Sequence, residues 1–144
     1  MGGQAGQAAA GSGGGGILLQ KHLVSSDTFH DVDSTTYVTI LTQEVTVAAT
    51  NRVYIDGTIY IQTAGNDNQC NIRIIRGTDE VAMVEGEIGF NGETQAIPIR
   101  ALETPGAGTY TYNIDVARGG ANDCEVNQAG ATSFMTTEVL SANP

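Results

Sequence analysis

The side chains that could catalyse a reaction or bind a metal are few in this 144-residue sequence. His22 and His30 are its only histidines, and no serine lies in the G-x-S-x-G pattern of a strained nucleophile turn. The run from His30 to Asp33 offers nitrogen and oxygen ligands, and the run from Asn66 to Asn68 offers oxygens without the rest of an EF-hand loop. Because Asn and Asp favour turns without any metal, we interpret both runs as solvated turns and expect no metal or cofactor.

Glu85 and Glu87 lie two residues apart and could share one face of a strand. A pair of carboxyl groups can act as general acid and base on a sugar substrate. The pair has no aromatic platform nearby in the sequence, and the chain contains no Trp. We therefore expect that the protein is not an enzyme.

The two cysteines, Cys70 and Cys124, are too few for a disulfide scaffold or for a zinc site with paired C-x-x-C motifs. Each lies beside a strand-like run, and each is expected to point inward with its neighbour, Ile72 or Val126. We favour two buried free thiols that act as small apolar side chains. A disulfide is the alternative, which an expected cytoplasmic origin disfavours.

Charge and hydropathy exclude several classes of partner. The chain has sixteen acids against six bases, for a net charge of −10, and its arginines are scattered. Nucleic-acid sites need clustered Lys and Arg, so neither nucleic acid nor an anionic membrane is an expected partner. No apolar run approaches the roughly 18 residues of a membrane-spanning helix. No basic leader precedes an apolar stretch at the N-terminus, so we expect synthesis in a host cytoplasm.

Alternation of apolar and polar residues predicts strands along most of the chain after residue 16. Residues 52–63 alternate throughout, and Gly57 in their middle indicates a bulge or a close neighbour. Pro98 indicates an edge strand or a bulge, and residues 25–34 are expected to form a polar loop. Turns recur at intervals typical of sandwiches. We therefore predict an all-β domain over residues 17–144: a single jelly-roll-like β-sandwich of about 8 strands.

The most regular predicted strand follows a turn at Pro105. It places Tyr110, Tyr112, Ile114 and Val116 on one face. These side chains are expected either to fill the core between the sheets or to form an oligomer interface, where Tyr contributes a large contact area.

Residues 1–16 contain only Gly, Ala, Gln and Ser after Met1. Such a segment cannot bury enough apolar surface to offset the entropy of ordering it, so we expect a flexible N-terminal arm. It is either a disordered tail or a tether that becomes ordered against a neighbouring subunit. The arm residues expected to bind a partner are Gly2, Gly3, Gln4, Gln7, Gly13 and Gly16.

Residues 101–116 (ALETPGAGTYTYNIDV) and 74–77 (IIRG) resemble segments of small bacteriophage virion β-sandwiches. Such domains occur in capsid decoration (cement) proteins and at fibre tips, and several are similar to the tumour necrosis factor-like jelly roll and form trimers. The resemblance implies a homotrimeric decoration protein that binds the major capsid protein, or another virion protein, on the capsid exterior. A short head or tail fibre and a secreted ligand-binding β-sandwich remain the alternatives.

Overall fold

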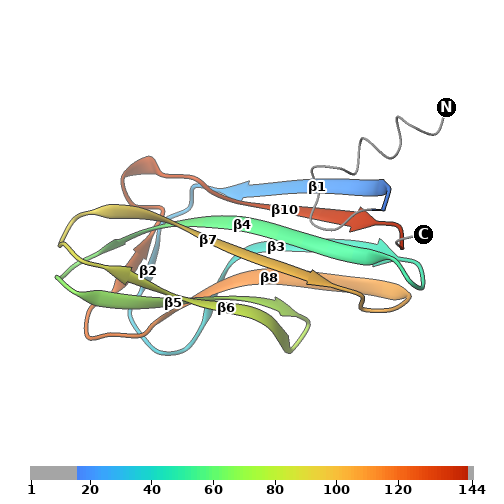
Figure 1. Ribbon diagram of the computed structural model, residues 1–144. Helices are drawn as coiled ribbons and strands as arrows, with labels where there is room; N and C mark the ends of the chain where they lie inside the picture. The colour runs from blue at the N-terminus through green and yellow to red at the C-terminus, as the bar shows by residue number, and fades with distance from the viewer. Residues whose placement is uncertain (1–15, 143–144) are drawn as a thin grey trace.

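The computed structural model describes residues 16–142, and within that range the chain forms ten strands and one 3₁₀ turn. Figure 1 shows the strands stacked as two sheets. The elements are β1 (Leu18–Ser26), β2 (His30–Val32), β3 (Val38–Val47), β4 (Arg52–Thr63), β5 (Asn68–Arg76), β6 (Asp79–Ile88), β7 (Thr94–Glu103), β8 (Gly108–Arg118), β9 (Cys124–Val126), η1 (Gln128–Gly130) and β10 (Ser133–Leu140). The predicted all-β class is confirmed.

Strand β4 is the centre of the larger, six-stranded sheet. One of its edges pairs with β7, and the other pairs first with β10 and then with β9. Beyond these neighbours lie β1 and β2, and the second sheet has the order β3-β8-β5-β6. When the three-residue strands β2 and β9 are set aside, one sheet has the order β1-β10-β4-β7 and the other β3-β8-β5-β6. If these eight long strands are counted from 1 to 8 along the chain, the two orders are 1-8-3-6 and 2-7-4-5. This interleaving of two Greek keys is a jelly roll, as predicted.

The alternation within β4 produces the two layers. Every second residue from Val53 to Thr63 is buried, and each residue between them is half-buried. Because successive strand residues point to opposite faces, one set enters the core and the other lies on the outer surface. Isoleucine, which packs well on a pleated sheet, supplies much of the core. The core isoleucines are Ile40, Ile55, Ile59, Ile61, Ile72, Ile74, Ile88, Ile97, Ile99 and Ile114.

Two glycines allow the sheets to approach each other closely. A Cβ atom on Gly57 of β4 would lie 2.3 Å from Cδ1 of Ile114, and one on Gly86 of β6 would lie 2.2 Å from Cδ1 of Ile97. Gly57 pairs in register with Met135 of β10. Of the two predicted explanations for Gly57, the close neighbour is therefore right and the bulge is wrong.

Strand β5 is tied to the opposite sheet at both ends. Cys70, near its start, forms a disulfide with Cys124 of β9, with 6.0 Å between the Cα atoms. The predicted free thiols are therefore wrong, because the jelly roll brings the inward sides of two distant strands together in the core. At the other end, Arg76 forms an ion pair with Glu103 of β7 and a second one, at 3.2 Å, with Asp79.

Two tyrosines of β8 hold the turn that precedes it. Tyr112 is buried, and its hydroxyl donates a hydrogen bond to Oε2 of Glu103 at 2.6 Å. Burial, and then this hydrogen bond, raise the pKa of Tyr112 far above its ordinary value. The hydroxyl of Tyr110 donates to the carbonyl of Pro105 at 3.0 Å, while the Arg76 guanidinium lies 5.7 Å from the Tyr110 ring.

Two further expectations can be compared with the structure. Residues 25–34 are not only a loop, because His30–Val32 forms β2, which pairs with β9 and buries Val32. That strand was missed because its three residues are too few to show a period. Pro98 lies on β7, an edge strand of the six-stranded sheet, as predicted.

We predict that Gly57→Ala destabilises the domain by about 1–3 kcal/mol, because the added methyl group overpacks the contact with Ile114. Ile114→Val removes Cδ1 and should cost about 0.5–1.5 kcal/mol alone. In the double variant the valine leaves room for the new methyl group, so the combined cost should be clearly smaller than the sum of the single costs. Chemical denaturation of the four proteins measures this coupling; strict additivity would contradict the contact.

Reduction of the disulfide should lower the free energy of unfolding by about 4 kcal/mol, because the crosslink closes a loop across a separation of 54 residues. Thermal unfolding with and without a phosphine reductant measures the change. The matched control is Cys70→Ala with Cys124→Ala, whose stability should not respond to reductant. A wild-type protein that responds no more than this control would show that the bond is absent.

Candidate functional site

The predicted arm residues fall mostly outside the part of the chain that the structure describes. Those outside it are Gly2, Gly3, Gln4, Gln7 and Gly13. Gly16 is the first described residue and has a left-handed φ of 79°. Next to it, the backbone N–H of Ile17 donates to Oγ of Ser141 at 2.8 Å, and the N–H of Ser141 donates back to the Ile17 carbonyl. The arm is therefore attached where β1 meets β10.

The four residues predicted to lie in the core or at an oligomer interface belong to the hydrophobic core of the domain or pack against it. Tyr112, Ile114 and Val116 are fully buried in the core, and Tyr110 packs against it partly buried. Their side chains already contact the six-stranded sheet of the same chain. A surface for a partner must therefore be sought elsewhere.

The outer surface of the six-stranded sheet is the most apolar strand surface. We call it the β4 face. Its members are Lys21 and Leu23 of β1, Phe134, Thr136 and Glu138 of β10, Arg52, Tyr54, Asp56, Thr58 and Tyr60 of β4, and Ala96, Pro98, Arg100 and Leu102 of β7. Leu23 is 69% exposed, Leu102 45% and Phe134 38%. Sequence reasoning missed this face, although the tyrosines at alternate positions of residues 52–63 were a signal for it.

The outer surface of the four-stranded sheet, which we call the β8 face, is polar. Its members are Thr39, Thr42, Glu44 and Thr46 of β3, Thr109, Thr111, Asn113 and Asp115 of β8, Gln69, Asn71 and Arg73 of β5, and Met83, Glu85 and Glu87 of β6. Arg73 binds Asp115 at 3.1 Å and stacks 3.9 Å from the centre of the Tyr37 ring. Met83 is the exposed large apolar side chain in this set.

The two faces also differ in charge. The β4 face carries three of the six bases of the chain and two of its sixteen acids, which gives +1. Four acids and one base on the β8 face give −3. On the β4 face the charges are paired: Lys21 lies 3.9 Å from Glu138, and Arg100 lies 3.4 Å from Asp56.

Glu138 keeps one unused acceptor on the β4 face. Its Oε2 faces Lys21, while its buried Oε1 accepts no hydrogen bond from any described residue. Tyr54 is its cross-strand neighbour on β4. A buried acceptor without a donor is costly, but a donor from outside the chain cannot reach this oxygen because the atom has almost no exposed surface.

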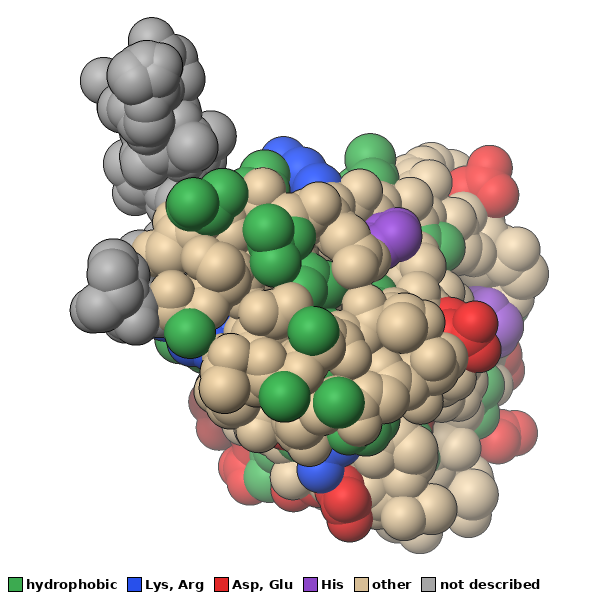
Figure 2. Space-filling view, turned by 90° about the vertical axis from the view of Figure 1, so that its right-hand side faces the viewer, with side chains coloured by type: hydrophobic (Ala, Val, Ile, Leu, Met, Phe, Trp, Pro, Cys, Tyr) green, Lys and Arg blue, Asp and Glu red, His purple; other side chains and the backbone are tan. Residues whose placement is uncertain are grey.

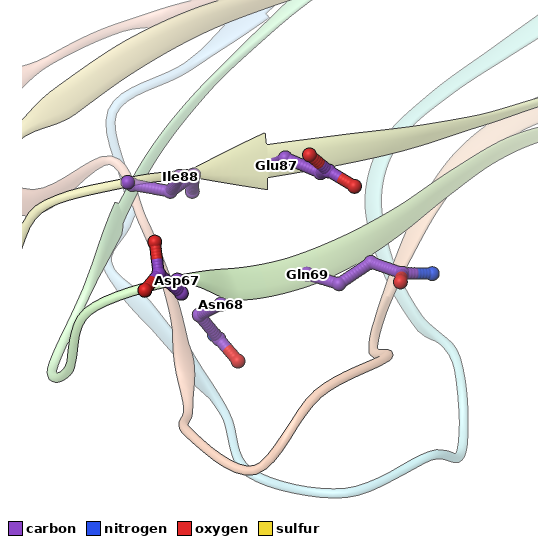
Figure 3. A pocket seen from close by; sticks show the side chains of 6 residues that line it. Asp67, Asn68, Gln69, Glu87 and Ile88 are labelled. Atoms are coloured by element: carbon purple, nitrogen blue, oxygen red, sulfur yellow. The ribbon is translucent and has the colours of Figure 1, made fainter.

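A small polar cavity of about 220 Å³ lies at the end of the sandwich that carries the longer connections. Its lining residues are Asp67, Asn68, Gln69, Glu87, Ile88 and Gly89, and Figure 3 shows them on the facing ends of β5 and β6. Asn68 is buried and already bonded: its Nδ2 donates to the Asn122 carbonyl at 2.8 Å, and its Oδ1 accepts from the Asn122 N–H at 3.1 Å. The Asn68 side chain therefore holds the connection at Asn122 in place, and its bonded groups are not free to bind a ligand in the cavity.

The same end of the molecule holds half of the sixteen acids of the chain. Its connections and strand ends carry one base, Arg118, against eight acids: Asp27, Asp31, Asp33, Asp67, Glu87, Glu93, Asp123 and Glu125. Figure 2 looks onto the opposite end, where hydrophobic side chains are scattered among polar ones over the left and centre of the view and acidic ones lie toward its right-hand and lower edges. The charge is thus unevenly distributed along the strands.

Two of these acids are direct cross-strand partners. Asp31 of β2 pairs with Glu125 of β9. Burial, then a hydrogen bond and repulsion from Asp123, raise the pKa of Asp31; burial, then repulsion from Asp31 and Asp123, raise the pKa of Glu125. Arg118 lies 3.8 Å from Asp123 on the other side. Like charges opposite each other weaken a strand pair.

In the run from Asn66 to Asn68, the two asparagine side chains bind other parts of the chain. Oδ1 of Asn66 accepts from the Asn91 N–H at 2.8 Å, and Asn68 is bonded as above. Among residues 16–142 no three His, Cys, Asp or Glu side chains are grouped to hold a metal. No helix in that part of the chain has the length and apolar character needed to cross a membrane.

Comparison with known proteins gives similarity of fold only. No protein-family model and no curated protein matches the chain. Among solved structures, the sugar-binding EclA C-terminal domain is 13% identical, with a TM-score of 0.41 over 91% of this chain and 88% of that one. The infectious bursal disease virus VP2 subviral particle is 10% identical, with a TM-score of 0.43 over 88% and 39%. Disulfide-linked pili of Bacillus endospore appendages are 12% identical, with a TM-score of 0.39 over 85% and 92%. At these scores the likenesses carry no conclusion about function.

We predict that Asp31→Asn stabilises the domain increasingly as the pH rises from about 4 to about 7. A carboxyl group whose pKa is raised by folding contributes stability below its unfolded pKa, and that contribution is lost as the pH rises through the folded pKa. The variant should thus match wild type near pH 4 and melt higher near pH 7. Asp27→Asn, which removes an equal charge from the preceding loop, is the control. An equal gain in both variants would assign the effect to net charge and not to the Asp31–Glu125 pair.

Proposed function

We propose that the chain is a bacteriophage virion structural protein, a homotrimeric capsid decoration protein that binds and stabilises the outer surface of a capsid. The β4 face carries this proposal. It is a sheet-sized, nearly neutral surface with exposed Leu and Phe side chains on a chain of net charge −10. Exposed apolar side chains that lie on one surface are typical of sites that bind other proteins.

The arm provides the second contact in this proposal. Residues 1–15 are attached at Gly16, beside the edge where β1 pairs with β10, and so next to the β4 face. Their Gly and Ala residues allow close approach to a partner's backbone. The proposed partner is the major capsid protein or another virion protein, without nucleic acid or membrane.

The disulfide supports a location on the outside of a particle. Disulfides persist in oxidising surroundings, which include virion surfaces, and are rare in a reducing cytoplasm. A chain that is made in the cytoplasm would form the Cys70–Cys124 bond after release of the particle. The bond then holds the short strand β9, which lies between β4 and β2, in place under extracellular conditions.

The acidic end favours a second candidate, a short head or tail fibre that binds a host receptor. Phe90 is 67% exposed and follows Gly89 of the polar cavity, and Phe29 is also exposed in a loop at this end. An aromatic ring beside amide and carboxylate groups is a combination that binds small polar ligands such as sugars. A secreted ligand-binding β-sandwich would use the same end.

We predict that deletion of residues 2–15 leaves the thermal stability of the domain unchanged but weakens binding to capsids by about tenfold or more, because the arm's contacts are lost. Co-sedimentation with particles that lack the protein measures the binding. Equal binding by both forms would assign attachment to the β domain alone. A copy number per particle far below that of the major capsid protein would favour the fibre.

A further inference from the structure

We infer that the β4 face is covered by a second copy of this chain. The inference rests on the proposed function, in which this face is an assembly surface, and it names the partner. Covering the face would be favourable, because Leu23, Leu102 and Phe134 expose large apolar side chains at its two sides. Removing such surface from water is the main driving force for association.

Charge favours a second copy over contact elsewhere on the molecule. The chain has a net charge of −10 and the β4 face has +1, so all other surfaces together carry −11. Two copies that meet through the β8 face or the acidic end bring like charges together. Two copies that meet through the β4 face keep those charges apart, while the pairs Lys21–Glu138 and Arg100–Asp56 neutralise most of the contact itself.

The size of the face also fits. Four adjacent strands of about nine residues, spaced by about 4.8 Å, cover roughly 20 by 30 Å, or about 600 Å². Two such faces bury about 1,200 Å², which is the lower end of the range for stable protein interfaces. Smaller contacts are rarely specific.

The polar groups of the face complement a copy of the same face. The carboxylate of Asp56 is a partly exposed acceptor, and the phenol groups of Tyr54 and Tyr60, which are half-buried on the same strand, are donors. When copies of one face meet about a twofold or threefold axis, both the acceptors and the donors of the contact must lie on that face. The β4 face has both.

The other possible occupants fit less well. Residues 1–15 hold only Gly, Ala, Gln and Ser after Met1, and none of those side chains is large enough to bury Leu or Phe. A capsid protein could cover the face only on the particle, which would leave it exposed in the free protein. That occupant makes a different prediction for the free state.

The test compares the full-length protein with two matched variants by size-exclusion chromatography with light scattering at several concentrations. Leu23→Glu with Leu102→Glu places two charges on the β4 face, at exposed positions that do not affect the core. Met83→Glu, at a comparably exposed apolar position on the β8 face, is the control. We expect wild type and Met83→Glu to be dimeric or trimeric, and the double variant to be monomeric with its dissociation constant raised by about 100-fold or more at an unchanged melting temperature.

Two outcomes overturn the inference: a monomeric wild-type protein, or a double variant that keeps the wild-type mass. Co-sedimentation with capsids, measured on the same proteins, separates the inference from the proposed function. If the wild-type protein is monomeric and the double variant no longer binds capsids, the β4 face binds a capsid protein. The proposed function would then stand, and the inference of a second copy would be wrong. If the wild-type protein is an oligomer that does not bind capsids, the second copy would stand and the proposed function would be wrong.

Discussion

The close approach of β4 and β8 across the core is the contact on which the rest of the structure depends. It is possible because Gly57 has no side chain at the place where Cδ1 of Ile114 lies. Interiors of proteins are packed nearly as densely as crystals, so one methyl group at this point would separate the sheets or displace a buried side chain. Ile55 and Ile59 of β4 and Tyr112 and Val116 of β8 lie on either side of this contact in the same core.

Two interactions then keep the sheets in register at their ends. At the acidic end the disulfide joins β5 to β9, and at the turn end Arg76 and Tyr112 both bind the carboxylate of Glu103 on β7. A carboxylate that is nearly enclosed needs such partners, because its charge is costly to remove from water. The tyrosines of β8 thus have an internal role. They connect the preceding turn to the core and leave the outer surfaces to other residues.

The outer surfaces of the two sheets differ in the polarity of their side chains. One sheet presents threonines and acids to solvent, and the other presents leucine, phenylalanine and tyrosine between two ion pairs. Most of the remaining negative charge lies at one end of the strands. A soluble sandwich without partners has no need for an apolar outer sheet, since scattered polar residues would cover it equally well. This asymmetry is the observation behind our proposals that the protein is part of an assembly and that the β4 face is its contact surface.

The amino-acid sequence by itself determined the strands, because a period of two is a local property that each segment carries in its own residues. Residues 52–63 and the strand containing Tyr110 to Val116 were predicted for this reason, and so were the inward cysteines. Pro98 was expected at an edge or a bulge for another local reason, because proline has no N–H to donate to a neighbouring strand. Tertiary structure decided everything that depends on which strands become neighbours. It paired Cys70 with Cys124, made β2 from three residues of an apparent loop, and placed Ile114 against Gly57. It also decided which outward-facing residues together form the β4 face. Leu23, Tyr54, Leu102 and Phe134 come from four strands that are distant in the chain. Alternation shows which side chains share a face of one strand, but only the order of strands in a sheet shows which faces combine into one surface.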